Sequence, residues 1–147
     1  MKYLYIVYQY LIGFPLVVVI TLITAIFTIV CFPWKNGKAP RAMQVLWPRS
    51  VLWLLLVPIK VTGKENVDTK QSYVFVANHQ SFLDVFAVYG WLPNNFKWLM
   101  KKEIRKVPFV GTACAVAGHI FVDRSNPRAA LKSIDLVKAE LVEGIST

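Results

Sequence analysis

The chain has 147 residues, of which 56% are hydrophobic, and its 17 Lys and Arg outnumber its 8 Asp and Glu, giving a net charge of +9. This length allows one small domain and a membrane segment. The two cysteines form no disulfide framework or metal pattern, and the aromatic residues lie in apolar runs, which argues against nucleic-acid binding. Because no acidic residue precedes Glu65, the basic and apolar first third is typical of a protein at an anionic membrane surface.

The stretch from Tyr3 to Trp34 has no charged residue and predicts a membrane helix. Its apolar core, Leu11 to Phe32, would be about 33 Å long as a helix, which is enough to cross a bilayer. We expect this segment to be retained, because a signal peptide has a shorter apolar region and a small-residue cleavage site. It either spans the bilayer or folds back near Gly13 and Pro15 to lie in one leaflet.

Polar side chains within this segment are expected at particular places. Four tyrosines suit one membrane interface and Trp34 suits the other; they are Tyr3, Tyr5, Tyr8 and Tyr10. Three threonines fall on one face of the helix and can bond back to its own backbone; they are Thr21, Thr24 and Thr28.

A basic connector containing Pro and Gly follows, from Lys35 to Arg49. Its positive charges outweigh Lys2, so the positive-inside rule places the following domain in the cytoplasm. Trp47 to Pro58 is apolar but too short to span, which predicts an interfacial helix; the alternative is an ordinary buried helix of the domain. We therefore divide the chain into a membrane helix at 1–34, a connector with an interfacial helix at 35–58, and a domain at 59–147.

The domain is expected to begin with an edge strand at Ile59–Gly63 and a polar loop, and then a short buried strand at Tyr73–Ala77. The sequence Ser81-Phe82-Leu83-Asp84 predicts a helix start that resembles a capping box. His79 then lies on the turn between strand and helix.

On a continuous helix, His79 and Asp84 would point about 140° apart. They can meet only if His79 precedes the helix and Asp84 lies in its first turn. An aspartate that accepts a hydrogen bond from one imidazole nitrogen leaves the other nitrogen as a base. The alternative is that Asp84 only caps the helix and His79 is a polar turn residue. No nucleophile is evident, since Cys114 lies in an apolar run and is expected in the core.

The second half of the domain contains a strand near Phe96–Met100 and an apolar helix or buried segment at Val110–Ala117. Between them lies a basic run that could attract phosphate or form a solvated face; its residues are Lys97, Lys101, Lys102, Arg105 and Lys106. A second strand leads from Gly118 to Asp123 and Arg124. Arg124 is well placed to hold a phosphate, and the alternative is a surface pair between Asp123 and Arg124.

His119, in the same stretch, is expected to be a turn residue and not a base. Asn126-Pro127 predicts the start of a helix that ends at Gly144. The chain then reaches Ile145-Ser146-Thr147, where an α/β alternation would begin its next strand.

Together these stretches resemble the 1-acyl-glycerol-3-phosphate acyltransferase family. The segment from Asn78 to Asp84 looks like its first motif, Asn-His-x4-Asp, and the segment from Gly118 to Arg124 looks like its second, Gly-x-x-Phe-(Ile/Val)-Asp-Arg. Lys101-Lys102-Glu103 followed by Val107–Gly111 is similar to the segment between these motifs. The resemblance covers roughly Ile59 to Thr147.

The resemblance implies an α/β fold with a mixed sheet flanked by helices. It also implies that His79, oriented by Asp84, removes the proton from the 2-hydroxyl of lysophosphatidic acid, and that the oxygen attacks the thioester of acyl carrier protein or coenzyme A to give phosphatidic acid. Arg124 would hold the acceptor's phosphate, helped by Lys101 or Lys102. Asn78 and Gly118 are also assigned to substrate binding. Neither a metal nor a cofactor is expected, and the enzyme would lie in the cytoplasmic (inner) membrane with its catalytic domain facing the cytoplasm.

The family's third motif, Pro-Glu-Gly-Thr-Arg, is absent, and Glu143-Gly144 is not that motif because Ile145 stands where Thr is needed. The sequence therefore looks like the N-terminal portion of a longer protein, truncated before its last strands. We expect the 147-residue chain alone to be nearly inactive, with an unpaired sheet edge. Two alternatives remain: an acyltransferase acting on another lipid acceptor such as glycerol-3-phosphate, and a non-catalytic membrane-anchored protein that binds anionic lipid.

Overall fold

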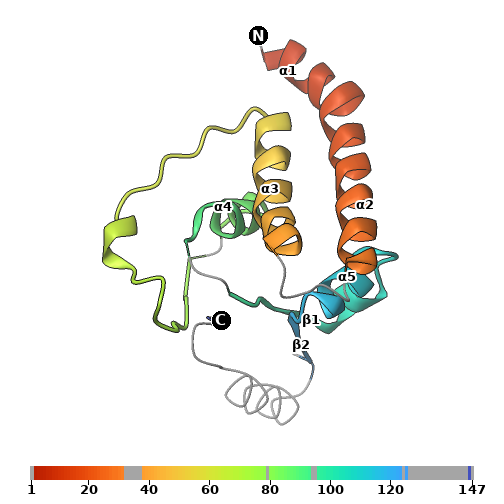
Figure 1. Ribbon diagram of the computed structural model, residues 1–147. Coiled ribbons are helices and arrows are strands. Elements are labelled where there is room, and N and C mark those ends of the chain that lie inside the picture. Colours follow the sequence, from red (N-terminus) through yellow and green to blue (C-terminus); the bar gives the residue numbers. More distant parts are fainter. Residues whose placement is uncertain are drawn as a thin grey trace. The chain divides into compact units, whose positions relative to one another are not determined.

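The computed structural model describes residues 2–31, 38–78, 80–93, 96–123, 125 and 146, apart from the side chains of residues 38–41. These residues form two compact units. The first consists of Met1–Thr62 with His79–Leu92, and the second consists of Gly63–Asn78 with Pro93–Thr147. Figure 1 shows their elements in sequence colours. The division into 1–34, 35–58 and 59–147 stays a prediction.

The first unit begins with one long helix. It consists of α1 (Lys2–Tyr8), a π-helical turn η1 (Gln9–Gly13) and α2 (Phe14–Val30). The expected alternative of a fold-back near Gly13 and Pro15 is wrong, because the π turn continues the helix past both residues. This helix, Lys2–Val30, is long and apolar enough to cross a membrane, and its most apolar window is only 11% buried. It could therefore anchor the chain to a membrane.

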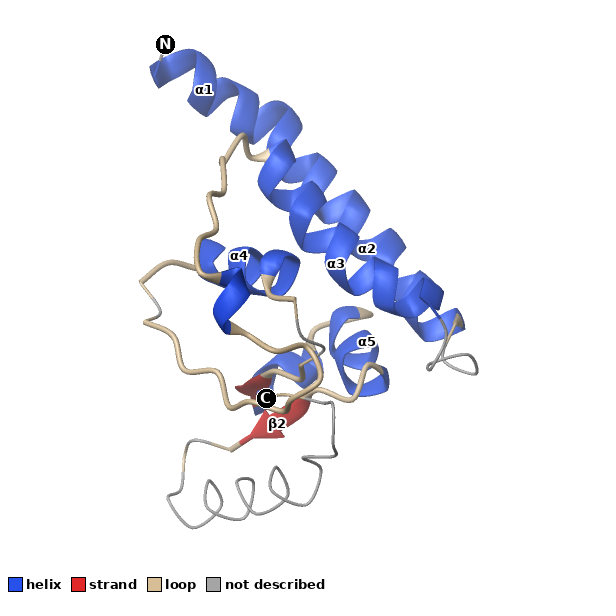
Figure 2. Ribbon diagram, turned by 60° about the vertical axis from the view of Figure 1, so that its left-hand side comes forward, coloured by secondary structure: helices blue, strands red, loops and turns tan. Residues whose placement is uncertain are grey.

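Helix α3 (Lys38–Leu54) runs antiparallel to α2 beside it (Figures 1 and 2). It begins well before the predicted Trp47, because the first turn of a helix tolerates Pro40. Pro48 lies in the helix interior, where it removes one backbone hydrogen bond, and its ring is fully buried. The helix ends at Leu54, ahead of the expected stop at Pro58.

The core of the first unit lies where α3 meets α4 (Leu83–Trp91). Val51 and Leu52 of α3 are 0% exposed and cluster with Leu55 and Phe86. The face of α3 that contains Val51 and Leu52 is thus buried, as predicted by the alternative of an ordinary buried helix of the domain. The opposite face remains apolar and exposed, with Trp53 at 71%, and its contact with a membrane stays a prediction.

The backbone carbonyls at the end of α3 are satisfied by tyrosines of α1. The hydroxyl of Tyr5 donates to the carbonyl of Leu55 and that of Tyr8 donates to the carbonyl of Leu54, each at 2.8 Å. These carbonyls are among those that a helix end leaves without an intrahelical partner. Two of the four tyrosines expected at a membrane interface therefore bind the end of the neighbouring helix.

The threonines of α2 behave largely as expected. The hydroxyls of Thr24 and Thr28 donate to the carbonyls four residues earlier, at 2.7 and 2.8 Å, which confirms the predicted back-bonding. Thr21 instead accepts a hydrogen bond from the indole Nε1 of Trp47 at 3.0 Å. This bond links α2 to α3.

Arg49 of α3 binds the last turn of α4. Its Nε donates to the carbonyl of Gly90 at 2.7 Å, and its guanidinium lies 5.3 Å from the ring centre of Trp91. The helices approach closely here because residue 90 has no side chain: a Cβ would lie 3.2 Å from the Cγ of Arg49.

The second unit contains a two-stranded parallel sheet of β1 (Leu99–Lys101) and β2 (Ile120–Val122), with Leu99 opposite Ile120 and Lys101 opposite Val122. Two short 3₁₀ turns, η3 (Lys64–Asn66) and η4 (Lys102–Lys106), and helix α5 (Val110–Val116) complete its described elements. The expected strand and helix in this half are confirmed. The predicted mixed sheet appears in the described residues as parallel pairing alone.

Ser146 forms an isolated parallel bridge with Phe96, and its carbonyl accepts a hydrogen bond from the N–H of Lys97 at 2.8 Å. Its hydroxyl also accepts from the N–H of Tyr73 at 3.0 Å. This parallel pairing falls at Ser146, within the three residues where the sequence predicted the next strand. The predicted helix from Asn126 to Gly144 lies outside the described residues.

Two expected strands are wrong. Ile59–Gly63 and Tyr73–Ala77 have no strand assignment in the structure, and Val76 is 91% exposed, so the second stretch is not buried. Its side chains do alternate, since Tyr73 and Phe75 are half-buried while Val74 and Val76 are exposed. The ring centre of Phe75 lies 5.5 Å from that of Tyr73 and 6.0 Å from that of Phe96. A strand also requires backbone hydrogen bonds to a neighbouring strand. Among the described residues, the pairing of this stretch is limited to the hydrogen bond from the N–H of Tyr73 to the hydroxyl of Ser146.

The end of α3 generates a stability prediction. Leu56 has φ 55°, while the N–H of Val57 donates to the carbonyl of Leu52 and that of Leu56 donates to Trp53, which is the Schellman pattern. Glycine is the residue that this left-handed position favours. Leu56→Gly should therefore be about 1 kcal/mol more stable than Leu56→Ala, which keeps the strained Cβ. Thermal unfolding of both variants in detergent micelles tests this, and equal stabilities would contradict it.

The tyrosine contacts generate a second prediction. Tyr8→Phe should lower the free energy of unfolding by about 1 kcal/mol, because it leaves the carbonyl of Leu54 without its donor. Tyr10→Phe is the matched control, since Tyr10 belongs to the same helix and is 71% exposed. Chemical denaturation in micelles compares the two. A loss as large for Tyr10→Phe would show that the hydroxyl bond is not the cause.

Candidate functional site

Asp84 lies in the first turn of α4, and its carboxylate turns back over the preceding residues. Its Oδ2 accepts hydrogen bonds from the N–H groups of Gln80 and Ser81, each at 2.7 Å. In return the hydroxyl of Ser81 accepts from the N–H of Leu83 at 3.1 Å, and its carbonyl accepts from the N–H of Asp84. This reciprocal arrangement is close to the predicted capping box. The layout proposed from the sequence, with Asp84 in the first helical turn, is confirmed.

The double hydrogen bond fixes the carboxylate beside the turn that precedes α4. Gln80, one of its two donors, directly follows His79 in the sequence. Backbone N–H donors favour the charged form of a carboxylate, so Asp84 is suited to stabilise a neighbouring cation. His79 itself lies outside the described residues, and its role as a base stays a prediction. Asn78 is exposed.

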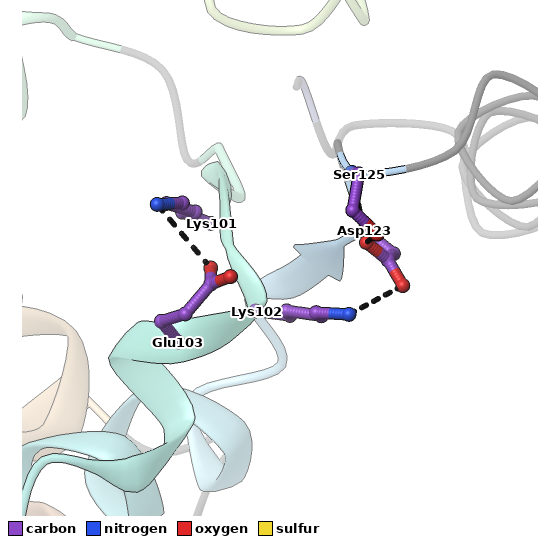
Figure 3. A network of polar contacts seen from close by, with 5 residues as sticks. All are labelled: Lys101, Lys102, Glu103, Asp123 and Ser125. Carbon is purple, nitrogen blue, oxygen red and sulfur yellow. Dashed lines mark hydrogen bonds and ion pairs between the residues drawn. The ribbon is translucent and has the colours of Figure 1, made fainter.

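The second group of candidate residues lies in the second unit, at the carboxyl ends of the two parallel strands. Lys102 directly follows β1 and Asp123 directly follows β2, one step beyond the register pair Lys101–Val122. The Nζ of Lys102 meets the Oδ2 of Asp123 at 2.5 Å (Figure 3). In open α/β sheets, ligands bind outside this edge.

Asp123 also bonds across the next two positions of the chain. Its Oδ1 accepts hydrogen bonds from the N–H and from the hydroxyl of Ser125, at 3.0 and 2.6 Å. This is an Asx turn, and it spans the position of Arg124, which lies outside the described residues. Asp123 thus forms a network with Lys102 and Ser125 (Figure 3), while the alternative of an Asp123–Arg124 pair lies outside the described residues and stays a prediction.

The network shifts two pKa values in opposite directions. The hydrogen bond from Lys102, followed by those from Ser125, holds the pKa of the Asp123 carboxyl well below its usual range. The hydrogen bond to Asp123 raises the pKa of Lys102. Both groups are therefore charged at neutral pH. Lys101 also has an acidic neighbour, since its Nζ lies 3.8 Å from Glu103.

Gly118, assigned to substrate binding, has a local structural role. It has φ 79°, its N–H donates to the carbonyl of Ala115, and the N–H of His119 donates to Cys114, so it ends α5 with a Schellman motif. A Cβ at this position would lie 3.0 Å from the Nζ of Lys97. The assignment of Gly118 to substrate binding stays a prediction.

The burial of His119 is a feature that the sequence did not identify. Its side chain is buried, and its Nδ1 accepts a hydrogen bond from the N–H of Trp98 at 3.2 Å. Burial, and then the positive charge of Lys97, lower the pKa of His119 to about 4. Its side chain is therefore neutral and buried in the core, while its backbone N–H belongs to the turn that ends α5. Alternation along β2 does not indicate its burial, since the buried positions of that strand are Ile120 and Val122 and His119 falls in the other phase.

Cys114 is poorly suited to act as a nucleophile. Burial raises the pKa of its thiol to about 11, so the thiolate is scarce at neutral pH. This agrees with its predicted place in the apolar interior. In the part of the chain that the structure describes, no group of three or more His, Cys, Asp or Glu side chains could hold a metal ion.

The buried His119 predicts a pH-dependent stability. Its pKa is about 4 when folded, against an ordinary value of about 6.5. The unfolded chain binds the extra proton as the pH falls from about 6.5 to about 4, so stability is lost across that window, by about 3 kcal/mol in total. His119→Asn keeps an acceptor for Trp98 and removes the titration. Urea unfolding at a series of pH values should give the variant a flatter profile, and parallel profiles would refute the assignment.

Comparison with known proteins agrees with the motifs. A family model described as Acyltransferase matches residues 58–146. The chain is 29% identical over 127 residues to a 1-acyl-sn-glycerol-3-phosphate acyltransferase of Cocos nucifera, covering 85% of this chain and 41% of that protein. It is 38% identical over 84 residues to an enzyme of the same name from Limnanthes douglasii, covering 57% and 29%.

A protein of the same name from Saccharomyces cerevisiae is 37% identical over 82 residues, covering 56% of this chain and 27% of its own length. The chain thus spans less than half the length of these relatives. No solved structure matches.

Proposed function

Since the chain belongs to the acyltransferase family, we propose that its protein transfers a fatty acyl group from a thioester to the 2-hydroxyl of 1-acyl-glycerol-3-phosphate, giving phosphatidic acid. The relatives' names support this acceptor. The thioester is that of acyl carrier protein or coenzyme A. The protein acts at the cytoplasmic membrane, with the catalytic domain on the cytoplasmic side, where the basic residues that follow the membrane helix favour it.

The observation that supports the chemistry best is the carboxylate of Asp84. Two backbone N–H groups hold it at the start of α4, and one of them belongs to the residue after His79. A carboxylate fixed in this way can orient an imidazole and stabilise the imidazolium that forms during reaction. Orientation of this kind is what a histidine base requires to act efficiently.

In the proposed reaction, His79 removes the proton from the 2-hydroxyl as the oxygen attacks the carbonyl carbon of the thioester. The new C–O bond forms and the C–S bond breaks. The departing sulfur takes the proton from the imidazolium, which restores neutral His79 and releases the thiol. The acyl group passes directly between the substrates, so no enzyme nucleophile is required, in agreement with the protonated Cys114.

The acceptor's phosphate is assigned to Arg124. The Asx turn of Asp123 and Ser125 supports this role, because it fixes the backbone on both sides of residue 124. Lys102 supports it from the neighbouring strand through its ion pair with Asp123. Lys101, which lies beside Glu103 and is exposed, is the second lysine assigned to the phosphate.

A mutational series tests the proposal. His79→Ala should lower the rate of acyl transfer by about 10²- to 10⁴-fold, because it removes the base. Asp84→Asn keeps an oxygen that can accept from Gln80 and Ser81 but removes the charge, so the rate should fall while the fold persists. Gln80→Ala is the control in the same turn, since its backbone N–H is retained. The assay follows labelled lysophosphatidic acid in membranes, using the complete product of the gene that encodes this chain.

The outcomes separate the competing functions. Equal rates for His79→Ala and the parent protein would refute the proposed base, and the absence of acyl transfer in both would favour a non-catalytic lipid-binding protein. A rate that depends on His79 but appears only with glycerol-3-phosphate would keep the chemistry and overturn the acceptor. Unfolding curves for Asp84→Asn distinguish lost chemistry from a lost helix cap.

A further inference from the structure

Three consecutive apolar residues of the second unit form an exposed tip between η4 and α5: Val107, Pro108 and Phe109. Val107 is 45% exposed and Phe109 is 52% exposed. Helix α5 buries its own apolar residues on its other side, for example Ala113. The phenyl ring of Phe109 is therefore presented outward and not into the core.

The backbone that presents this ring is strained. Phe109 has φ 60° and ψ −49°, and the N–H of Val110 reaches the carbonyl of Pro108 at 2.6 Å, which closes a three-residue turn of the rare classic γ type. A left-handed conformation is unfavourable for a bulky residue. Glycine would avoid that strain, so the presence of phenylalanine at an exposed, strained position points to a use for its side chain.

Backbone hydrogen bonds and close packing also fix the position of the tip. The N–H of Gly111 donates to the carbonyl of Val107 at 2.8 Å, and that of Ala113 donates to Phe109 at 2.9 Å. Gly111 packs so closely on η4 that a Cβ would lie 2.2 Å from the carbonyl oxygen of Arg105. The local packing thus fixes the base of the turn and leaves Phe109 at its apex.

Basic residues border the tip on one side. Positions 101–106 contain four basic residues and a single acid, and the four are exposed; they are Lys101, Lys102, Arg105 and Lys106. The guanidinium of Arg105 lies 5.7 Å from the ring centre of Phe121, so its stem covers the sheet while its charge stays near the surface. Apolar side chains beside lysine and arginine are the pattern that binds at the interface of an anionic bilayer.

We propose that Val107-Pro108-Phe109 is a second membrane contact of this chain, separate from the N-terminal helix, which inserts its apolar side chains among the headgroups of an anionic leaflet. A bilayer is favoured over a protein partner because three residues supply far less than the roughly 800 Å² per partner that a stable protein interface buries. The long apolar helix of the same chain would keep the tip near a membrane. The inference does not depend on acyl transfer.

The test places a fluorescent label at the tip. In the full chain with Cys31 and Cys114 replaced by Ala, Phe109→Cys and Val76→Cys are each labelled with an environment-sensitive fluorophore and reconstituted into phosphatidylcholine vesicles with or without phosphatidylglycerol. Val76 is the matched control, since it is apolar, belongs to the same unit and is 91% exposed. Lipids with a quencher near the headgroup should quench the label at 109 in the anionic vesicles and leave that at 76 unaffected.

Two further variants separate the roles of charge and ring, with the label moved to Val107→Cys. Lys106→Gln should lower the ratio of inserted to exposed tip by about fivefold, because each basic residue near an anionic surface contributes about that factor. Phe109→Gly relieves the strained backbone, so it should fold well and yet reduce quenching at 107.

Equal quenching at 109 and 76 would overturn the proposal. So would quenching at 109 that is indifferent to phosphatidylglycerol, since the basic residues would then have no part. Protection of the label from aqueous quenchers without quenching by lipid would show that protein covers the tip.

Discussion

The structure depends on how the backbone groups at its helix ends find partners. The last carbonyls of α3 accept from two tyrosine hydroxyls of α1, and the carbonyl of Gly90 in α4 accepts from Arg49 of α3. Each of these bonds joins two helices while it satisfies one of them. Because the polar ends are satisfied by neighbours, the apolar residues Val51 and Leu52 can be buried completely between them. The hydrogen bonds at the helix ends thereby fix how the helices of the first unit pack.

In the two candidate site segments, side-chain carboxylates accept hydrogen bonds from the groups of a neighbouring turn. Asp84 accepts two N–H groups before α4, and Asp123 accepts an N–H and a hydroxyl after β2. In each case an acidic side chain shapes a turn next to a residue assigned to chemistry, His79 or Arg124. A structural role for these aspartates and a functional one are therefore not alternatives. For Asp123, the hydrogen bonds that keep the turn in shape also hold the pKa of the carboxyl below its usual range.

Local patterns predicted local structure well. The spacing from Ser81 to Asp84 predicted the start of α4, and the apolar run before Gly118 predicted α5, because caps and helical periods involve neighbouring residues. The strand at Tyr73–Ala77 failed because alternation shows which side chains face inward but not whether a ladder partner exists. The ion pair of Lys102 with Asp123 joins residues 21 positions apart. Only the register of β1 on β2 brings them together, and sequence spacing does not contain that register.

The bridge between Phe96 and Ser146 has a consequence for synthesis on the ribosome. Ser146 emerges about 50 residues after Phe96, which takes roughly 3 to 10 s at about 5–20 residues per second. During that interval the N–H of Lys97 and that of Tyr73 lack the partner that Ser146 later supplies. Nascent chains therefore expose this sheet edge, beside the apolar Phe75 and Phe96, for seconds. A holdase that shields extended apolar backbone would be most useful to this chain in that window, before the parallel pairing can close.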